Sequence, residues 1–197
     1  MPVTQRFVHG GVCLVFAVLT ISVVVIALGA SRTSTSNAGL AGSTAPQFTL
    51  RTATNEWVSL ESSVGKVSVV AFIDGKRDSI ISPVSNLSDT VGVFESDASV
   101  SFISVIDLSD VGVALRSTLA TLPQSVRVVT DIDGAVARAY RVGVNESVAF
   151  VIDEQGIIHG RVPLRDASSV IALTEAVSSL KRAEFTQPLA QSTNTSR

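Results

Sequence analysis

Residues 65–73 read GKVSVVAFI, and residues 74–83 continue as DGKRDSIISP. The run 67–73 is apolar on consecutive residues and rich in β-branched side chains, which is typical of a central strand covered on both faces. Asp74 and Gly75 end the run, and a helical pattern follows at 82–94. A buried strand followed by a helix predicts an α/β domain.

The same alternation continues along the chain. Further strand-like runs lie at 100–106, 127–130 and 149–152, and the last is followed by a turn at 153–156 and a hairpin partner at 157–162. Gly156 is expected to supply a positive φ in that turn. Other helices are predicted at 109–122, 134–140 and 166–183. This order predicts a mixed central sheet flanked by helices on both faces.

The chain ends differ from this domain in composition. Residues 10–30 contain no charge over a length that spans a bilayer core, so they predict a transmembrane anchor, with a cleaved signal peptide as the alternative. Arg6 and His9 place a short N-terminus (1–9) in the cytoplasm and the rest outside. This predicts a single-pass protein of the cell membrane, or a secreted one if the segment is cleaved. Small polar residues predict a flexible linker at 31–44, a folded domain at 45–185 and a disordered tail at 186–197.

The composition of the chain excludes several kinds of chemistry. The 197 residues include one Cys, Cys13, which lies in the predicted anchor, and two His. One sulfur cannot make an intramolecular disulfide, a Cys-x-x-Cys pair or a thiolate zinc site. The net charge of −2 gives no reason to expect a nucleic-acid partner. We therefore expect no metal and no cofactor.

Five motifs in order resemble one known family. They are GSTAPQFTL at 42–50, WVSL at 57–60, GKVSVVAFI at 65–73, VVTDIDGAVARAYRV at 128–142 and AFVIDEQGIIHGRV at 149–162. Together they resemble the thioredoxin-like redoxin domains, that is, the peroxiredoxins of the AhpC/TSA type and the membrane-anchored thiol-disulfide oxidoreductases. The resemblance covers essentially the whole domain and implies a thioredoxin-like fold. The residues that carry it also shape turns and fill a core, so they predict fold rather than activity.

The family's redox site falls on residues that cannot perform thiol chemistry. The resemblance places a Cys-x-x-Cys pair at Arg77 and Ile80, or a peroxidatic cysteine at Ile80 or Ile81. It places a cis-proline next to the redox pair, where this chain has Ser147. Two separate parts of the family site are therefore missing. This indicates a degenerate active site on a conserved scaffold.

The loops around these positions form the candidate binding face. A thioredoxin-like fold presents the loop after the first central strand, the loop at 107–110 and the loop before the 149–152 strand on one side, whether or not cysteines remain. A protein partner is expected to bind this face. Lys76 and Arg77 beside a helix N-terminus also suit an anion, although a solvated loop with Asp78 or Ser79 capping the helix is favoured. The candidate residues are Asp74, Lys76, Arg77, Asp78, Asn145 and Ser147.

Three other polar residues can be given either a structural or a chemical role. Asp131 and Asp133 suggest metal or acid/base work, but in DIDG before a helix they are better suited to capping it. His159 is the only histidine in the domain and is interpreted as a partly exposed strand residue rather than the base of a serine hydrolase.

Two functions follow from the sequence. The favoured one is a redox-inactive redoxin domain at the membrane, acting as a binding or assembly module. The alternative is an enzyme, an antioxidant or thiol-disulfide oxidoreductase as the resemblance implies, with a cysteine supplied by a partner. Disulfide exchange needs an attacking thiolate, and the predicted extracytoplasmic part has none.

Overall fold

The structure is a computed structural model that describes residues 39–75, 80–106 and 117–186. The predicted anchor, most of the predicted linker, the tail and the loop at 107–110 lie outside the described residues. Within the described ranges, no helix combines the length and the apolar character needed to cross a bilayer.

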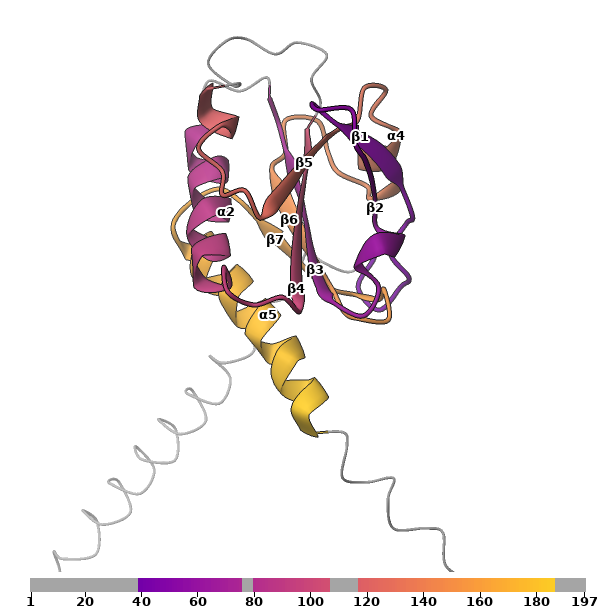
Figure 1. Cartoon of the computed structure of the whole chain (residues 1–197), viewed down its shortest axis with the longest axis vertical. Coiled ribbons are helices and arrows are strands. Elements are labelled where there is room, and N and C mark those ends of the chain that lie inside the picture. The colour runs from indigo at the N-terminus through magenta and orange to yellow at the C-terminus, as the bar shows by residue number, and fades with distance from the viewer. Residues whose placement is uncertain (1–38, 76–79, 107–116, 187–197) are drawn as a thin grey trace, which may run out of the picture. The chain divides into compact units, whose positions relative to one another are not determined.

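A seven-stranded mixed sheet forms the centre of the domain (Figure 1), in the order β2-β1-β5-β4-β3-β6-β7. Strands β3, β4 and β5 run parallel to one another, while β1, β6 and β7 pair with their neighbours in antiparallel fashion. The strands are β1 Thr49–Thr52, β2 Trp57–Ser59, β3 Val67–Ile73, β4 Val100–Ile106, β5 Val126–Thr130, β6 Val148–Ile152 and β7 Ile158–Pro163.

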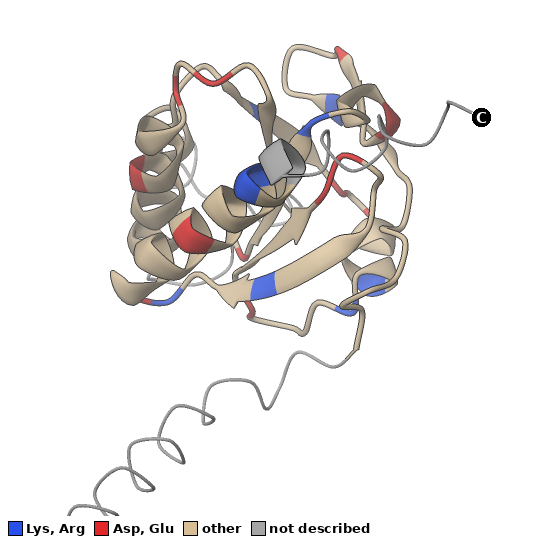
Figure 2. Ribbon diagram, turned by 90° about the horizontal axis from the view of Figure 1, so that it is seen from below, with Lys and Arg blue, Asp and Glu red and all other residues tan. Residues whose placement is uncertain are grey.

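Helices cover both faces of the sheet. The helices α2 (Ile81–Val93) and α5 (Ser168–Thr186) pack on one face, and the short helix α4 (Ala135–Ala139) lies on the other (Figure 1). A 3-10 turn, η1 (Glu61–Ser63), precedes β3. Charged residues lie mainly on helices and loops, with the two signs interspersed, while the strands are mostly uncharged (Figure 2).

Strand β3 supplies side chains to both cores. All seven of its residues are buried, and they alternate between two clusters as the pleat requires. Val69 and Ala71 face α2 and α5, whereas Val70 and Phe72 face the side of α4. The sequence predicted this strand with the observed bounds.

The core on the α4 side is built around one tyrosine. Tyr140 is fully buried, and its ring centroid lies 5.1 Å from those of both Phe72 and Phe150. Its hydroxyl donates a hydrogen bond to the Pro46 carbonyl at 3.0 Å. Burial raises the pKa of this phenol. Tyr140 therefore ties the end of α4 and the segment before β1 to the centre of the sheet.

The structure extends the predicted elements at a few points. The structure adds a β1–β2 hairpin, which was not predicted as a pair of strands. The described residues begin at Gly39, inside the predicted linker, and there Gly42 N–H donates to the Ile158 carbonyl at 2.8 Å. Of the helix predicted at 109–122, residues 117–119 are helical and residues 107–116 lie outside the described ranges. Gly156 has φ 83°, as the predicted turn requires.

Two substitutions in the aromatic core distinguish the contribution of ring packing to stability from the contribution of the tyrosine hydrogen bond. Phe150→Ala is expected to lower the free energy of unfolding by about 3–5 kcal/mol, because it empties a fully buried position. Tyr140→Phe keeps the ring and removes only the hydroxyl, so it should cost about 1 kcal/mol. Urea unfolding of both variants measures the difference. Equal losses would mean that Phe150 does not pack as described.

Candidate functional site

Two of the vacant cysteine positions lie where α2 begins. Ile80 is the N-cap residue of α2 and is buried, whereas Ile81 starts the helix and is 68% exposed. Neither side chain offers a nucleophile. Lys76, Arg77 and Asp78 lie outside the described residues.

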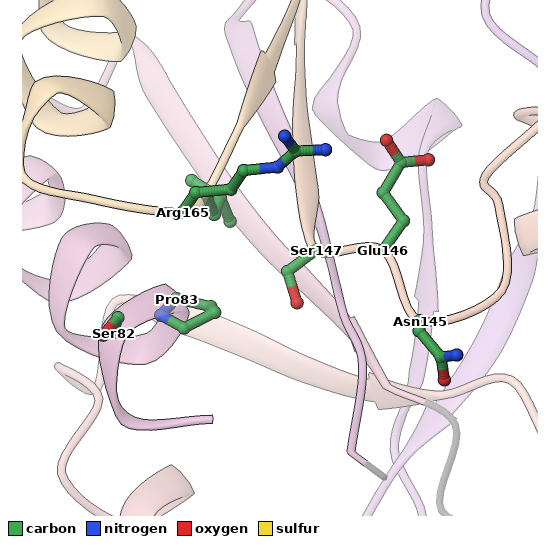
Figure 3. A pocket seen from close by; sticks show the side chains of 7 residues that line it. Ser82, Pro83, Asn145, Glu146, Ser147 and Arg165 are labelled. Atoms are coloured by element: carbon green, nitrogen blue, oxygen red, sulfur yellow. The ribbon is translucent and has the colours of Figure 1, made fainter. Parts of the chain in front are cut away.

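A cleft of about 390 Å³ opens beside the start of α2 (Figure 3). Three segments that are far apart in sequence form it: the first turn of α2, the loop before β6 and the residues that follow β7. The predicted candidates Asn145 and Ser147 are thus placed beside the helix that follows the vacant cysteine positions. The lining residues are Ser82, Pro83, Asn145, Glu146, Ser147, Leu164 and Arg165.

Ser147 fastens the loop before β6 to its neighbours. Its hydroxyl accepts a hydrogen bond from the Asp74 backbone N–H at 3.1 Å, at the end of β3. Its carbonyl accepts another from the Leu164 N–H at 2.9 Å, just after β7. The residue in the position that the resemblance gives to cis-proline therefore connects three segments of the site. The first of these bonds places Asp74 close to Ser147.

Glu146 holds the same loop in place through an ion pair and a hydrogen bond. Its carboxylate pairs with Arg161 on β7 and accepts a hydrogen bond from the Gly143 N–H at 2.9 Å. Partial burial alone would raise the pKa of Glu146, but the bonds from Gly143 and Arg161 and the charges of Arg161 and Arg165 together lower it. The carboxylate is therefore ionised at neutral pH. Figure 3 shows the side chains of Glu146 and Arg165 on either side of Ser147.

Sequence reasoning included Ser82 and Glu146 only as parts of predicted loops, and it missed Pro83 and the two cleft residues after β7. The pairing of Glu146 with Arg161 depends on the β6–β7 register, which places Arg161 opposite Phe150. Asn145 was predicted, and it is exposed with φ 59°. The only available signal for Glu146 was its position between two predicted residues.

The remaining predicted residues have structural roles. Asp131 Oδ2 accepts a hydrogen bond from the Ala137 N–H at 2.8 Å, and Asp133 Oδ1 accepts one from the Ala135 N–H at 3.1 Å, so both cap α4 as expected. The His159 side chain is 48% exposed and pairs with Asp153 at 2.7 Å near the β6–β7 turn. Among the described residues, no three His, Cys, Asp or Glu side chains are grouped closely enough to hold a metal ion.

The mixed sheet, the helices on both faces and the face formed at the start of α2 define a thioredoxin-like domain. The model of the AhpC/TSA family matches residues 41–161, more than half of the chain. The chain belongs to the AhpC/TSA family. No curated protein matches it significantly by sequence.

Solved structures share the fold at low sequence identity. A putative thiol:disulfide interchange protein DsbE from Chlorobium tepidum has a TM-score of 0.60 and 23% identity, covering 71% of this chain and 96% of that chain. A secreted Mycobacterium tuberculosis disulfide oxidoreductase homologous to E. coli DsbE has a TM-score of 0.56 and 22% identity, covering 68% and 96%. BsSco, of the Sco family of cytochrome c oxidase assembly proteins, has a TM-score of 0.55 and 16% identity, covering 70% and 94%. At these identities the likeness establishes the fold alone.

Removal of the Ser147 hydroxyl tests whether its hydrogen bond to the Asp74 N–H stabilises the domain. Ser147→Ala is expected to lower the free energy of unfolding by about 1 kcal/mol, because the Asp74 N–H loses its acceptor. Ser147→Thr keeps a hydroxyl and serves as the control. Urea unfolding compares the two, and equal stability of Ser147→Ala and the native chain would contradict the role.

The charge of Glu146 predicts a pH-dependent contribution to stability. Because its folded-state pKa lies below the unfolded value, the stabilisation is fully present above the unfolded pKa and is lost as pH falls through the folded pKa. Glu146→Gln should therefore cost about 1 kcal/mol at pH 7, and the difference from the native chain should shrink in acid. Urea unfolding at several pH values measures this. Glu95→Gln, which makes the same substitution at an exposed glutamate after α2, is the control.

Proposed function

We propose that this protein is a membrane-anchored, extracytoplasmic redoxin domain that carries out no thiol chemistry and binds a protein partner through the face at the start of α2. The observation that carries the proposal is the position of the only sulfhydryl. Cys13 lies inside the apolar segment 10–30, and residues 14–197 contain no cysteine.

Thiol chemistry needs a sulfur at the site. Disulfide exchange begins with attack by a thiolate, and peroxide reduction in this family likewise uses a cysteine near the start of a helix. Here Ile80 and Ile81 occupy that place. Neither serine of the cleft, Ser82 or Ser147, has a histidine among the cleft residues to act as its base.

The same face has the character of a contact surface for a protein. Ile81 is 68% exposed and Val144 is 91% exposed, and both lie beside the cleft or its loop. Exposed apolar side chains next to charged groups such as Glu146 and Arg165 are typical of protein interfaces. The loop is held in place by the bonds of Ser147 and Glu146, so little ordering entropy is lost when a partner binds.

Two further observations support the location and the role. The uncharged segment 10–30 has the length of a membrane-spanning helix. Among proteins of similar fold, the Mycobacterium tuberculosis oxidoreductase is secreted, and BsSco belongs to a family of assembly proteins. A binding or assembly role outside the cytoplasm agrees with both.

The second candidate function is thiol-disulfide oxidoreductase activity with a cysteine supplied by a partner. The names of the similar structures favour it, since two of them are thiol-disulfide enzymes. In this candidate function, disulfide exchange would be started by a thiolate of the partner and not by this chain.

Site-directed crosslinking in membranes tests the binding face. A photo-crosslinking amino acid at position 81 or 145 is expected to capture the same partner. The control position is Gln155, which is exposed in the turn at the other end of β6. Equal capture from position 155, or none from 81 and 145, would contradict the proposed face.

An activity assay separates the two candidate functions. The full chain in detergent should show no reduction of insulin disulfides or of peroxide above background, and Cys13→Ser should not change that result. Turnover by the native chain that Cys13→Ser abolishes would overturn the redox-inactive function.

A further inference from the structure

Asp131 has one carboxylate oxygen whose hydrogen-bonding capacity is unused. The residue directly follows β5 and is 2% exposed. Its N–H donates to the Ile106 carbonyl at 3.0 Å, and its Oδ2 caps α4 through the Ala137 N–H. Oδ1 is buried and has no hydrogen-bond partner. A buried acceptor without a donor is unfavourable, so such a group points to a missing partner.

A pocket of about 240 Å³ lies against this carboxylate. Its walls are mostly apolar and come from the ends of β3 and β4, from α4 and from the loop before β6. Asp74 and Glu146 also line it, so three of its residues are acidic. The pocket shares Asn145 and Glu146 with the cleft beside α2. The apolar wall residues are Phe72, Ile73, Val105, Ala137, Val142 and Val144.

The pocket contains one basic residue, and that residue is occupied elsewhere. Arg138 Nη1 donates to the Asp133 carbonyl at 2.7 Å. Glu146 is held by Arg161 from β7, outside the pocket. Both arginines are thus bonded to other groups, and neither donates to Asp131 Oδ1.

The size and the walls restrict the ligand. Drug-sized ligands occupy about 300–1,000 Å³, so this pocket suits a single side chain better than a cofactor. A carboxylate among the lining residues of a mostly apolar pocket favours a cationic head on a methylene stem, because the stem packs on the walls while the head makes a charge-assisted hydrogen bond.

We propose that this pocket receives one lysine or arginine side chain of the protein partner, with its cationic head on Asp131 Oδ1. The inference rests on the proposed function and names the anchor residue of that contact. The partner is therefore expected to present a basic residue beside the segment that lies in the cleft. A buried ion pair of this kind contributes specificity and slows dissociation.

Fragment binding tests the pocket without the partner. The ¹⁵N-labelled full chain in detergent micelles is titrated with n-butylguanidinium, and the amide signals of Gly134, Ala137 and Val142 are followed. We expect saturable shifts with a dissociation constant in the range of about 1–10 mM, which is usual for a fragment of this size. Pentanoate, an anion of similar length, is expected to cause no saturable shift. Equal effects of the two probes, or no saturable shift with n-butylguanidinium, would overturn the inference.

Charge removal at two neighbouring aspartates locates the site. Asp131→Asn should weaken n-butylguanidinium binding at least tenfold, whereas Asp133→Asn, which removes the same charge from an exposed capping residue outside the pocket, should leave it within twofold. Unchanged binding to Asp131→Asn would overturn the inference.

A second variant remains informative if Asp131→Asn does not fold. Val144→Arg places a tethered cation at an exposed position of the pocket rim, so it should preserve the fold and compete with n-butylguanidinium. A folded Val144→Arg that binds the fragment as well as the native chain would contradict the inference. Because no partner is needed, failure here is distinct from failure of the crosslinking that tests the proposed function.

Discussion

The complete burial of β3 on both faces is the constraint on which the rest of the domain depends. Its seven residues alternate between a core with α2 and α5 and a core with Tyr140, so helices must cover both sides of the sheet. The parallel pairing with β4 and the antiparallel pairing with β6 follow on its two edges. Where β3 ends, the apolar run stops and Asp74 follows, whose N–H donates a hydrogen bond to Ser147 of the cleft.

The shape of the candidate site depends on a small set of hydrogen bonds. The face is positioned by hydrogen bonds that do not involve the cysteine positions: Ser147 connects the ends of β3 and β7, and Glu146 closes the loop before β6. Ile80 fills the buried N-cap position of α2 with an apolar side chain, which adds to the core and offers no nucleophile. The bonds that hold this face in shape therefore do not require a cysteine.

The parts of the fold that the sequence predicted are those with a local signal. Apolar runs marked β3, β4 and β6, and the DIDG turn marked the caps of α4, because these features depend on neighbours in the chain. The β1–β2 hairpin escaped prediction since its strands are short and half exposed. The Glu146–Arg161 pair depends on strand register, and the missing donor of Asp131 Oδ1 depends on packing from four segments. Neither can be read from local sequence.

In the proposed function, the absence of thiol chemistry changes what the binding face must supply. An oxidoreductase holds its substrate in part through a transient covalent bond, whereas a binding module depends on non-covalent contacts alone. The cleft and the pocket beside Asp131 share Asn145 and Glu146, so one partner segment can contact both. The cleft offers area and the pocket offers one buried charge, and a buried charge discriminates strongly because a partner without the complement leaves it unpaired. In the proposed complex, specificity would come from Asp131, a residue outside the family's redox site.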